Sequence, residues 1–147
     1  MSEIIPNLWL GPIGLTYDSE FLTTNKISHV VRVLEDQNTS ATLYNLGIKT
    51  HYIKLYDDDD QPIGDYFDSS ISFIDDAIRC GNAVYVHCYA GVSRSPTIVA
   101  AYLIKMHNMT TVDALKYIAE RRPCIDPNEG FCAALRKWET LSATTFT

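Results

Sequence analysis

The chain has 147 residues, of which 46% are hydrophobic and 20% charged, and its formal net charge at pH 7 is −6. This length suits one domain with its own core, and the composition is that of a folded globular protein. The acidic balance argues against a broad surface for nucleic acid or for an anionic membrane, because both require a basic face.

Strands and helices alternate along the predicted chain. Segments 29–35, 50–56 and 83–88 are short and rich in β-branched and aromatic residues, which predicts strands. Helical spacing of apolar residues marks 66–79, and then 95–107, 110–122 and 129–141 in succession. The predicted apolar stripes are Phe67, Ile71, Ile74 and Ile78, then Val112, Leu115, Ile118 and Ala119, and finally Phe131, Leu135 and Trp138.

This order predicts an α/β domain with a central, mostly parallel, twisted sheet flanked by helices on both faces. We expect one catalytic domain over residues 1–141 and a short C-terminal tail over 142–147, where no pattern continues. In such sheets, ligands bind beyond the carboxyl ends of the strands. The segment after residue 88 lies at that end.

The sequence also bears on compartment and cofactors. No signal-peptide pattern opens the chain, and its longest apolar runs fall short of the roughly 18 residues of a spanning helix. The four cysteines lack C-x-x-C spacing, so we expect reduced thiols and no zinc site. We therefore expect an intracellular protein, in the cytoplasm or nucleus, with no metal or other cofactor and no membrane or nucleic-acid partner.

The stretch "HCYAGVSRS", residues 87–95, carries the chemistry. It forms the loop between a central strand and a helix whose first turn holds Pro96, and Ser95 is a candidate N-cap. Backbone amides at a helix N-terminus make a phosphate-sized anion site, and Gly91 lets the backbone bend closely around it. We expect the whole loop to bind substrate, through Tyr89, Ala90, Gly91, Val92, Ser93 and Arg94.

Three side chains of the loop have distinct predicted roles. Arg94 offers a planar fork that can take two phosphoryl oxygens, and the positive field at the helix N-terminus favours the thiolate of Cys88. Ser95 could donate a hydrogen bond to the sulfur when it leaves. His87 is expected to order the loop from behind. Taken singly, each of these side chains is equally well explained as an ordinary core or surface residue. Together they predict a nucleophile beneath an anion site.

The same stretch resembles the HC-x5-R-S/T signature of the cysteine-dependent protein phosphatases, and its neighbours look like the dual-specificity branch. The resemblance extends to "IIPNLWLGP", "FIDDAI", "SRSPTIVAAYLI" and "RRPCIDPNEGF", and so covers nearly the whole chain. It implies a small, stand-alone, atypical member of that family with a dual-specificity phosphatase-like fold. Asn128 and Phe131 match family positions in the "PNEGF" turn and are expected to have supporting, packing roles.

A phosphatase of this kind needs an acid to protonate the leaving oxygen, and the run Asp57–Asp60 is its obvious source. Most of such a run is expected to be a solvated acidic turn. The residues alone do not distinguish the four aspartates. The family's general-acid loop aligns with this chain without a gap at Asp57, and Asp58 is the alternative if the loop has gained or lost a residue.

We therefore predict a metal-independent, monomeric protein phosphatase that hydrolyses phosphotyrosine and phosphoserine or phosphothreonine through a cysteinyl phosphate on Cys88. The alternatives are a phosphoprotein-binding module with little turnover, and a phosphatase acting on RNA 5′-phosphates or phosphoinositides; an arsenate reductase or sulfurtransferase fits less well. Arg121 and Arg122 could bind a second phosphate at the pocket rim or simply interact with a helix C-terminus.

Overall fold

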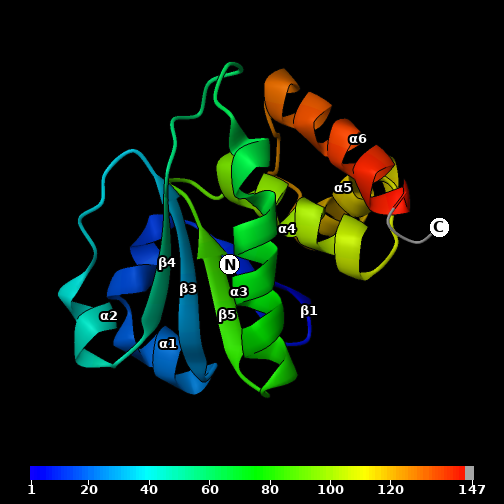
Figure 1. Ribbon diagram of the computed structural model, residues 1–147. Coiled ribbons are helices and arrows are strands. Elements are labelled where there is room, and N and C mark those ends of the chain that lie inside the picture. The colour runs from blue at the N-terminus through cyan, green and yellow to red at the C-terminus, as the bar shows by residue number, and fades with distance from the viewer. Residues whose placement is uncertain (145–147) are drawn as a thin grey trace.

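Five strands form one sheet in the computed structural model, which describes residues 1–144 (Figure 1). Their order in the sheet is β1-β2-β5-β3-β4. The strands are β1 (Ser2–Ile5), β2 (Leu8–Gly11), β3 (Ile27–Leu34), β4 (Lys49–Lys54) and β5 (Ala83–His87). Only the β1–β2 hairpin is antiparallel, and the other three pairings are parallel. The predicted mostly parallel sheet is confirmed.

Helices cover both faces of the sheet (Figure 1). One face carries η1 (Ile13–Tyr17), α1 (Ser19–Thr24) and α2 (Ala41–Asn45). The other carries η2 (Ile63–Tyr66), α3 (Phe67–Arg79), α4 (Arg94–Met106), α5 (Thr111–Arg121) and α6 (Glu129–Thr144). The four longest were predicted, whereas α1 and α2 were not. Helix α6 continues three residues into the predicted tail, and residues 145–147 lie outside the described part of the chain.

The two faces of the sheet bury separate sets of side chains, because successive residues of a strand point to opposite faces. Val30 and Tyr85 pack against α1 and α2, whereas Val31 and Val86 belong to the larger core beneath α3 to α6. All five residues of β5 are buried, as expected for a central strand flanked by β2 and β3. Strand β5 is thus a rigid base for the segment that follows it.

Most residues of the predicted apolar stripes face the core. Phe67, Ile71 and Ile74 are buried on α3, but Val112 on α5 is 74% exposed. It lies in the first turn of α5, where Ala114 and Ile118 face the core instead. Within residues 1–144, no helix has both the length and the apolar character needed to cross a membrane.

Candidate active site

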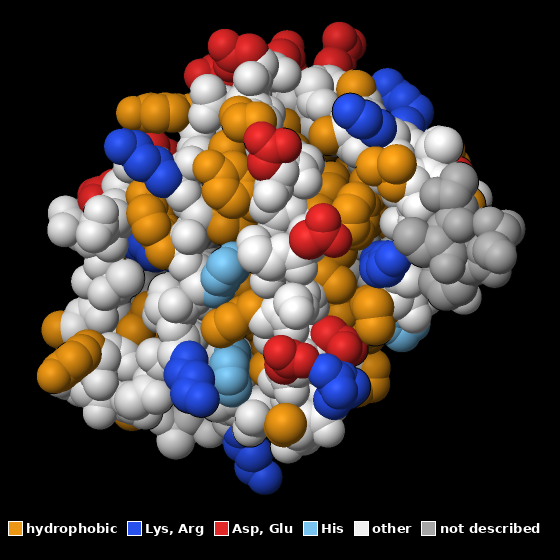
Figure 2. Space-filling view, in the orientation of Figure 1, with side chains coloured by type: hydrophobic (Ala, Val, Ile, Leu, Met, Phe, Trp, Pro, Cys, Tyr) orange, Lys and Arg blue, Asp and Glu red, His pale blue; other side chains and the backbone are white. Residues whose placement is uncertain are grey.

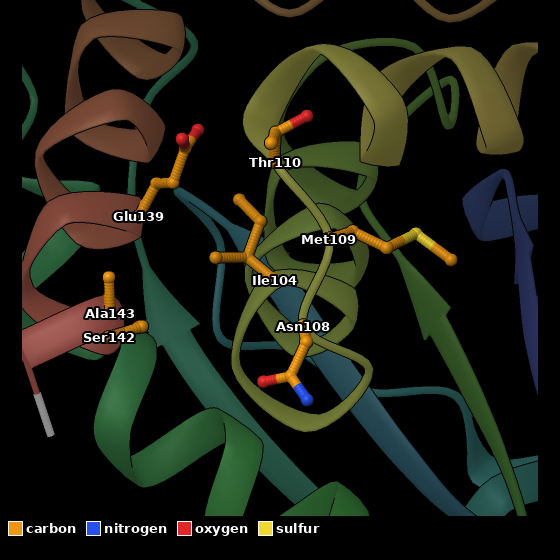
Figure 3. Close-up of a pocket in the computed structure, with 7 residues that line it drawn as sticks. All are labelled: Ile104, Asn108, Met109, Thr110, Glu139, Ser142 and Ala143. Atoms are coloured by element: carbon orange, nitrogen blue, oxygen red, sulfur yellow. The ribbon is translucent and has the colours of Figure 1, made fainter. Parts of the chain in front are cut away.

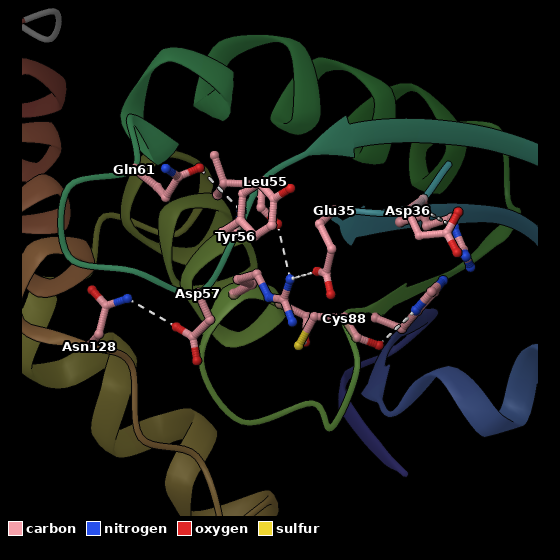
Figure 4. A network of polar contacts seen from close by, with 12 residues as sticks. Glu35, Asp36, Leu55, Tyr56, Asp57, Gln61, Cys88 and Asn128 are labelled. Atoms are coloured by element: carbon pink, nitrogen blue, oxygen red, sulfur yellow. Dashed lines mark hydrogen bonds and ion pairs between the residues drawn. The ribbon is translucent and has the colours of Figure 1, made fainter. Parts of the chain in front are cut away.

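The loop from Cys88 to Ser93 connects β5 to α4 at the carboxyl edge of the parallel strands. Cys88 directly follows β5 and is 2% exposed. The structure brings it together with Arg94, Ser95, Asp57 and Asn128, as shown in part by Figure 4. The residues that the sequence predicted for one site therefore come from three separate segments and meet at one place.

Four consecutive carbonyl groups of this loop are bonded to the surrounding protein. The oxygen of Tyr89 accepts from the Ile13 amide at 3.0 Å, and that of Val92 from the Asp126 amide at 2.7 Å. The oxygens of Ala90 and Gly91 accept from the Arg122 guanidinium, each at 2.9 Å. In a trans peptide the N–H points opposite to the C=O, so the amides of residues 90–93 face the inside of the loop. The loop thus presents an array of donors suited to an anion.

Gly91 is required by this path of the chain. Its φ is +71°, a left-handed conformation that only glycine adopts at little cost. A Cβ at this position would lie 2.7 Å from both the Gly11 carbonyl carbon and the Arg122 guanidinium. The loop therefore packs tightly against β2 on one side and Arg122 on the other.

Arg94 divides its donors between the protein and the interior of the loop. Its Nη1 donates both to the Glu35 carboxylate, at 2.5 Å, and to the Leu55 carbonyl, at 2.9 Å (Figure 4). These bonds use both hydrogens of Nη1. The parallel N–H groups of Nε and Nη2 remain, which form the edge of a guanidinium that binds two oxygens of one phosphoryl group.

The sulfur of Cys88 lies 3.1 Å from the Ser95 hydroxyl, as the sequence led us to expect. Ser95 is not the N-cap, however. Helix α4 begins at Arg94 with Ser93 at its N-cap, and the Ser93 hydroxyl accepts from the Asn128 amide rather than from its own helix. A side-chain cap would occupy amides that this loop leaves for a ligand.

His87 is fully buried beneath the loop, and its Nδ1 lies 3.0 Å from the Cys88 carbonyl oxygen. Burial lowers the pKa of His87 to about 4, so the ring is neutral near pH 7. A carbonyl can only accept, so Nδ1 carries the proton and Nε2 does not. His87 thus fixes the backbone of Cys88 and is unsuited to act as a base on substrate.

The acidic run lies on the loop between β4 and η2, with all four aspartates exposed. Asn128 Nδ2 donates to the Asp57 carboxylate at 2.9 Å, and Figure 4 shows Asp57 between Asn128 and Cys88. Asp59 instead accepts from the Gly130 amide. Figure 2 shows the acidic side chains at the edge of the molecule where this loop projects. Of the four aspartates, Asp57 is therefore the one that lies beside the loop after β5.

Arg121 and Arg122 turn out to differ. Arg122 is committed to the two loop carbonyls, so its role is within the protein. Arg121 donates to the Tyr117 carbonyl, and its guanidinium carbon lies 3.5 Å from the centroid of the Tyr117 ring. Arg121 therefore interacts with the C-terminal part of its own helix, which is the alternative expected from the sequence. Arg122 matches neither expectation, because it bonds the loop after β5.

Two partners of Arg94, Glu35 and the Leu55 carbonyl, were not predicted from the sequence. Both directly follow a parallel strand, β3 and β4 respectively, so their position at the carboxyl edge of the sheet was the available signal.

A separate cavity of about 210 Å³ lies between the α4–α5 turn and the end of α6 (Figure 3). Its carboxylate, Glu139, accepts from the Thr111 amide. No group of three or more His, Cys, Asp and Glu side chains in residues 1–144 is arranged to hold a metal ion.

Known proteins resemble this chain along nearly its whole length. A family model described as the dual specificity phosphatase catalytic domain matches residues 8–141. The chain is 37% identical over 139 residues to dual specificity protein phosphatase 1B of Arabidopsis thaliana, covering 95% of this chain and 81% of that protein. It is 35% identical over 139 residues to dual specificity protein phosphatase 22 of Homo sapiens, covering 95% and 73%.

Solved structures agree with these matches. The crystal structure of the human tyrosine phosphatase-like serine/threonine/tyrosine-interacting protein has a TM-score of 0.91 at 31% identity and covers 97% of each chain. That of DUSP15 has a TM-score of 0.87 at 30% identity, covering 100% of this chain and 97% of the other.

Proposed function

The chain belongs to the dual specificity phosphatase family and is a protein phosphatase, and we propose that it hydrolyses phosphotyrosine, phosphoserine and phosphothreonine through a cysteinyl phosphate on Cys88. Its substrates are phosphorylated proteins. The proposal assigns Cys88 as nucleophile, Arg94 and the loop amides as the phosphoryl site, Asp57 as acid and base, and Ser95 as a donor to the sulfur.

One observation carries the proposal: a buried cysteine lies at the base of a loop whose amides face its interior, together with the free Nε–Nη2 edge of Arg94. A transferring phosphoryl group spreads negative charge over three equatorial oxygens. Donors already fixed around those oxygens stabilise the transition state without having to reorganise. Glu35 and the Leu55 carbonyl support this by fixing the plane of the Arg94 guanidinium.

In the first step the Cys88 thiolate attacks phosphorus, the S–P bond forms, and the bond from phosphorus to the ester oxygen breaks. The Asp57 carboxylic acid gives its proton to that oxygen, which leaves as an alcohol or phenol. In the second step a water attacks phosphorus and gives a proton to the Asp57 carboxylate. The S–P bond breaks, and the Ser95 hydroxyl, 3.1 Å away, stabilises the departing thiolate.

The loop composition supports a protein substrate over a phosphoinositide. Its variable positions are Tyr89, Ala90, Val92 and Ser93, with no lysine among them to hold further phosphates. The net charge of −6 likewise disfavours RNA.

The test compares hydrolysis of a phosphotyrosyl peptide and a phosphothreonyl peptide by the wild type and by Cys88→Ser, with a chelator present. We expect turnover by the wild type alone and phosphopeptide binding by both, because a serine hydroxyl is a far poorer nucleophile at neutral pH. Binding without turnover by the wild type would instead identify a phosphoprotein-binding module.

A further inference from the structure

A cluster of polar side chains is buried behind the active-site loop, on the face of the sheet covered by α1 and α2. Arg32 on β3 pairs in register with His87 on β5 and with Tyr52 on β4, and paired residues of adjacent strands share a face. Arg32 is 1% exposed and His87 is fully buried. Three atoms of the cluster, Arg32 Nη1, His87 Nε2 and Tyr52 Oη, are buried without a hydrogen-bond partner among the described residues.

The other two nitrogens of Arg32 hold the segment that follows β3. Nε donates to the Asp36 carbonyl at 3.4 Å, and Nη2 donates to the Asn38 carbonyl. Arg32 forms no ion pair within residues 1–144, so its donors serve the backbone rather than a carboxylate. Glu35 lies between β3 and these two carbonyls. By wrapping residues 36–38 around itself, the guanidinium fixes the backbone from which the Glu35 side chain extends to Arg94.

The third nitrogen of Arg32 complements His87. The Nδ1–H of His87 faces the Cys88 carbonyl, which leaves Nε2 as a buried acceptor. Arg32 Nη1 is a buried donor on the adjacent strand at the paired position. The two atoms are complementary, one a donor and the other an acceptor, and both are buried without a hydrogen-bond partner among the described residues. Arg32 thus lies between the segment that holds Arg94 and the residue that holds the nucleophile's backbone.

We propose that Arg32 is a positioning residue for phosphoryl transfer, acting through Glu35 on the guanidinium of Arg94. This inference rests on the proposed function in taking Arg94 as the group that binds the phosphoryl oxygens. A lysine could not replace Arg32, because the three N–H groups of an ammonium share one nitrogen and cannot reach the separate positions of Nε, Nη1 and Nη2. Without Arg32 the segment after β3 would be held less firmly. Glu35 would then no longer keep the Arg94 guanidinium in the orientation that binds two phosphoryl oxygens.

The test is a double-mutant cycle of Arg32→Met and Glu35→Gln, read by the dissociation constant of inorganic phosphate and by kcat and KM on a phosphopeptide. We expect Arg32→Met to weaken phosphate binding and raise KM about 10-fold, with kcat changed less, because positioning of a bidentate donor is lost. In the Glu35→Gln background the same substitution should change phosphate affinity by less than about 2-fold, because the ion pair between Glu35 and Arg94, through which Arg32 acts, is already lost.

The control is Tyr52→Phe, which removes the third unpartnered atom of the cluster but no contact to residues 36–38, and it should leave phosphate affinity unchanged. A full effect of Arg32→Met in the Glu35→Gln background, or no effect in a folded Arg32→Met variant, would overturn the inference. Loss of affinity in Tyr52→Phe would do the same. If Arg32→Met does not fold, Arg32→Lys replaces it in the cycle with the same expected direction. Phosphate binding can be measured without turnover, so it tests the role of Arg32 separately. A wild type that binds phosphate but does not hydrolyse a phosphopeptide would contradict only the proposed function.

Discussion

At the scale of single residues, Asp57 is one of four consecutive aspartates, and a side chain 71 residues further along the chain distinguishes it. Asn128 also caps α6, since its Oδ1 accepts from the Phe131 amide at 2.9 Å. The sequence assigned Asn128 a packing role, but its contacts place it as the partner of the proposed acid. No local pattern could reveal this, because the two residues meet only through the fold.

Asp57→Asn should lower kcat on phosphoserine and phosphotyrosine peptides about 10²–10⁴-fold, the usual contribution of general acid catalysis. The loss should be smaller on an activated aryl phosphate, whose leaving group needs no proton. Steady-state kinetics on both substrate types measures the difference.

Asp58→Asn is the matched control, and it should retain most of the wild-type kcat. If Asp58→Asn proves the more damaging of the two substitutions, the acid has been assigned to the wrong aspartate.

Gly91→Ala should abolish most activity and destabilise the protein, because it combines a positive φ with a Cβ 2.7 Å from Gly11 and Arg122. Gly81→Ala separates the two effects: its φ is +81°, but nothing lies within 4 Å of the added Cβ. It should cost about 1 kcal/mol and leave kcat intact. Urea unfolding and kcat/KM are the measurements, and equal behaviour of the two variants would show that packing around the loop is unimportant.

At the scale of elements, the first turn of α6 carries the acid loop. Gly130 donates to the Asp59 carboxylate, and a Cβ at position 130 would overlap the Asp59 carbonyl. The glycine therefore allows the acid loop to lie against the helix, with Asn128 beside Asp57. The start of α6 therefore holds both Asp57, the proposed acid, and Asp59.

Gly130→Ala should displace the acid loop and lower kcat by about 10-fold or more while preserving most of the stability, since alanine favours a helix over glycine. Gly64→Ala is the control, because the nearest atoms to its added Cβ lie 3.9 Å away, at ordinary contact distance. A Gly130→Ala variant with wild-type kcat would mean that the loop does not need this contact.

The elements that the sequence predicted are those with a long repeat of apolar residues, such as α3 and α4. Helices α1 and α2 have only six and five residues, too few for a helical period to be recognised. The loop from Cys88 to Arg94 was predictable because its chemistry is contiguous in sequence. The partners of that loop, Glu35 and Arg122, come from distant segments, and only the folded sheet brings them to it.

At the scale of the whole molecule, buried histidine links stability to pH. The pKa of His87 falls from 6.5 to about 4 on folding because burial disfavours the charged ring. Between these pH values the unfolded chain binds a proton that the folded chain does not. The contribution of His87 to the free energy of unfolding is therefore fully present above pH 6.5 and is lost as the pH falls toward 4. The shift at His87 corresponds to about 3 kcal/mol of unfolding free energy. Burial also lowers the pKa of His29 and of His51, so both act in the same direction.

His87→Asn should therefore remove part of the acid destabilisation, because its amide nitrogen can take the place of Nδ1 without titrating. Urea unfolding of wild type and variant across the same pH window isolates the His87 contribution from that of the carboxylates, which both proteins share. Parallel curves would show that His87 does not carry the linkage.

The most direct test of the proposed mechanism is to trap its covalent intermediate. A phosphopeptide labelled on its phosphoryl group is mixed with the wild-type enzyme, quenched rapidly in acid and digested, and the labelled fragment is identified. We expect the label on the fragment that contains Cys88, and no label with Cys88→Ser. Turnover by the wild type with the label on another residue, or with no labelled fragment at any quench time, would contradict a cysteinyl phosphate on Cys88.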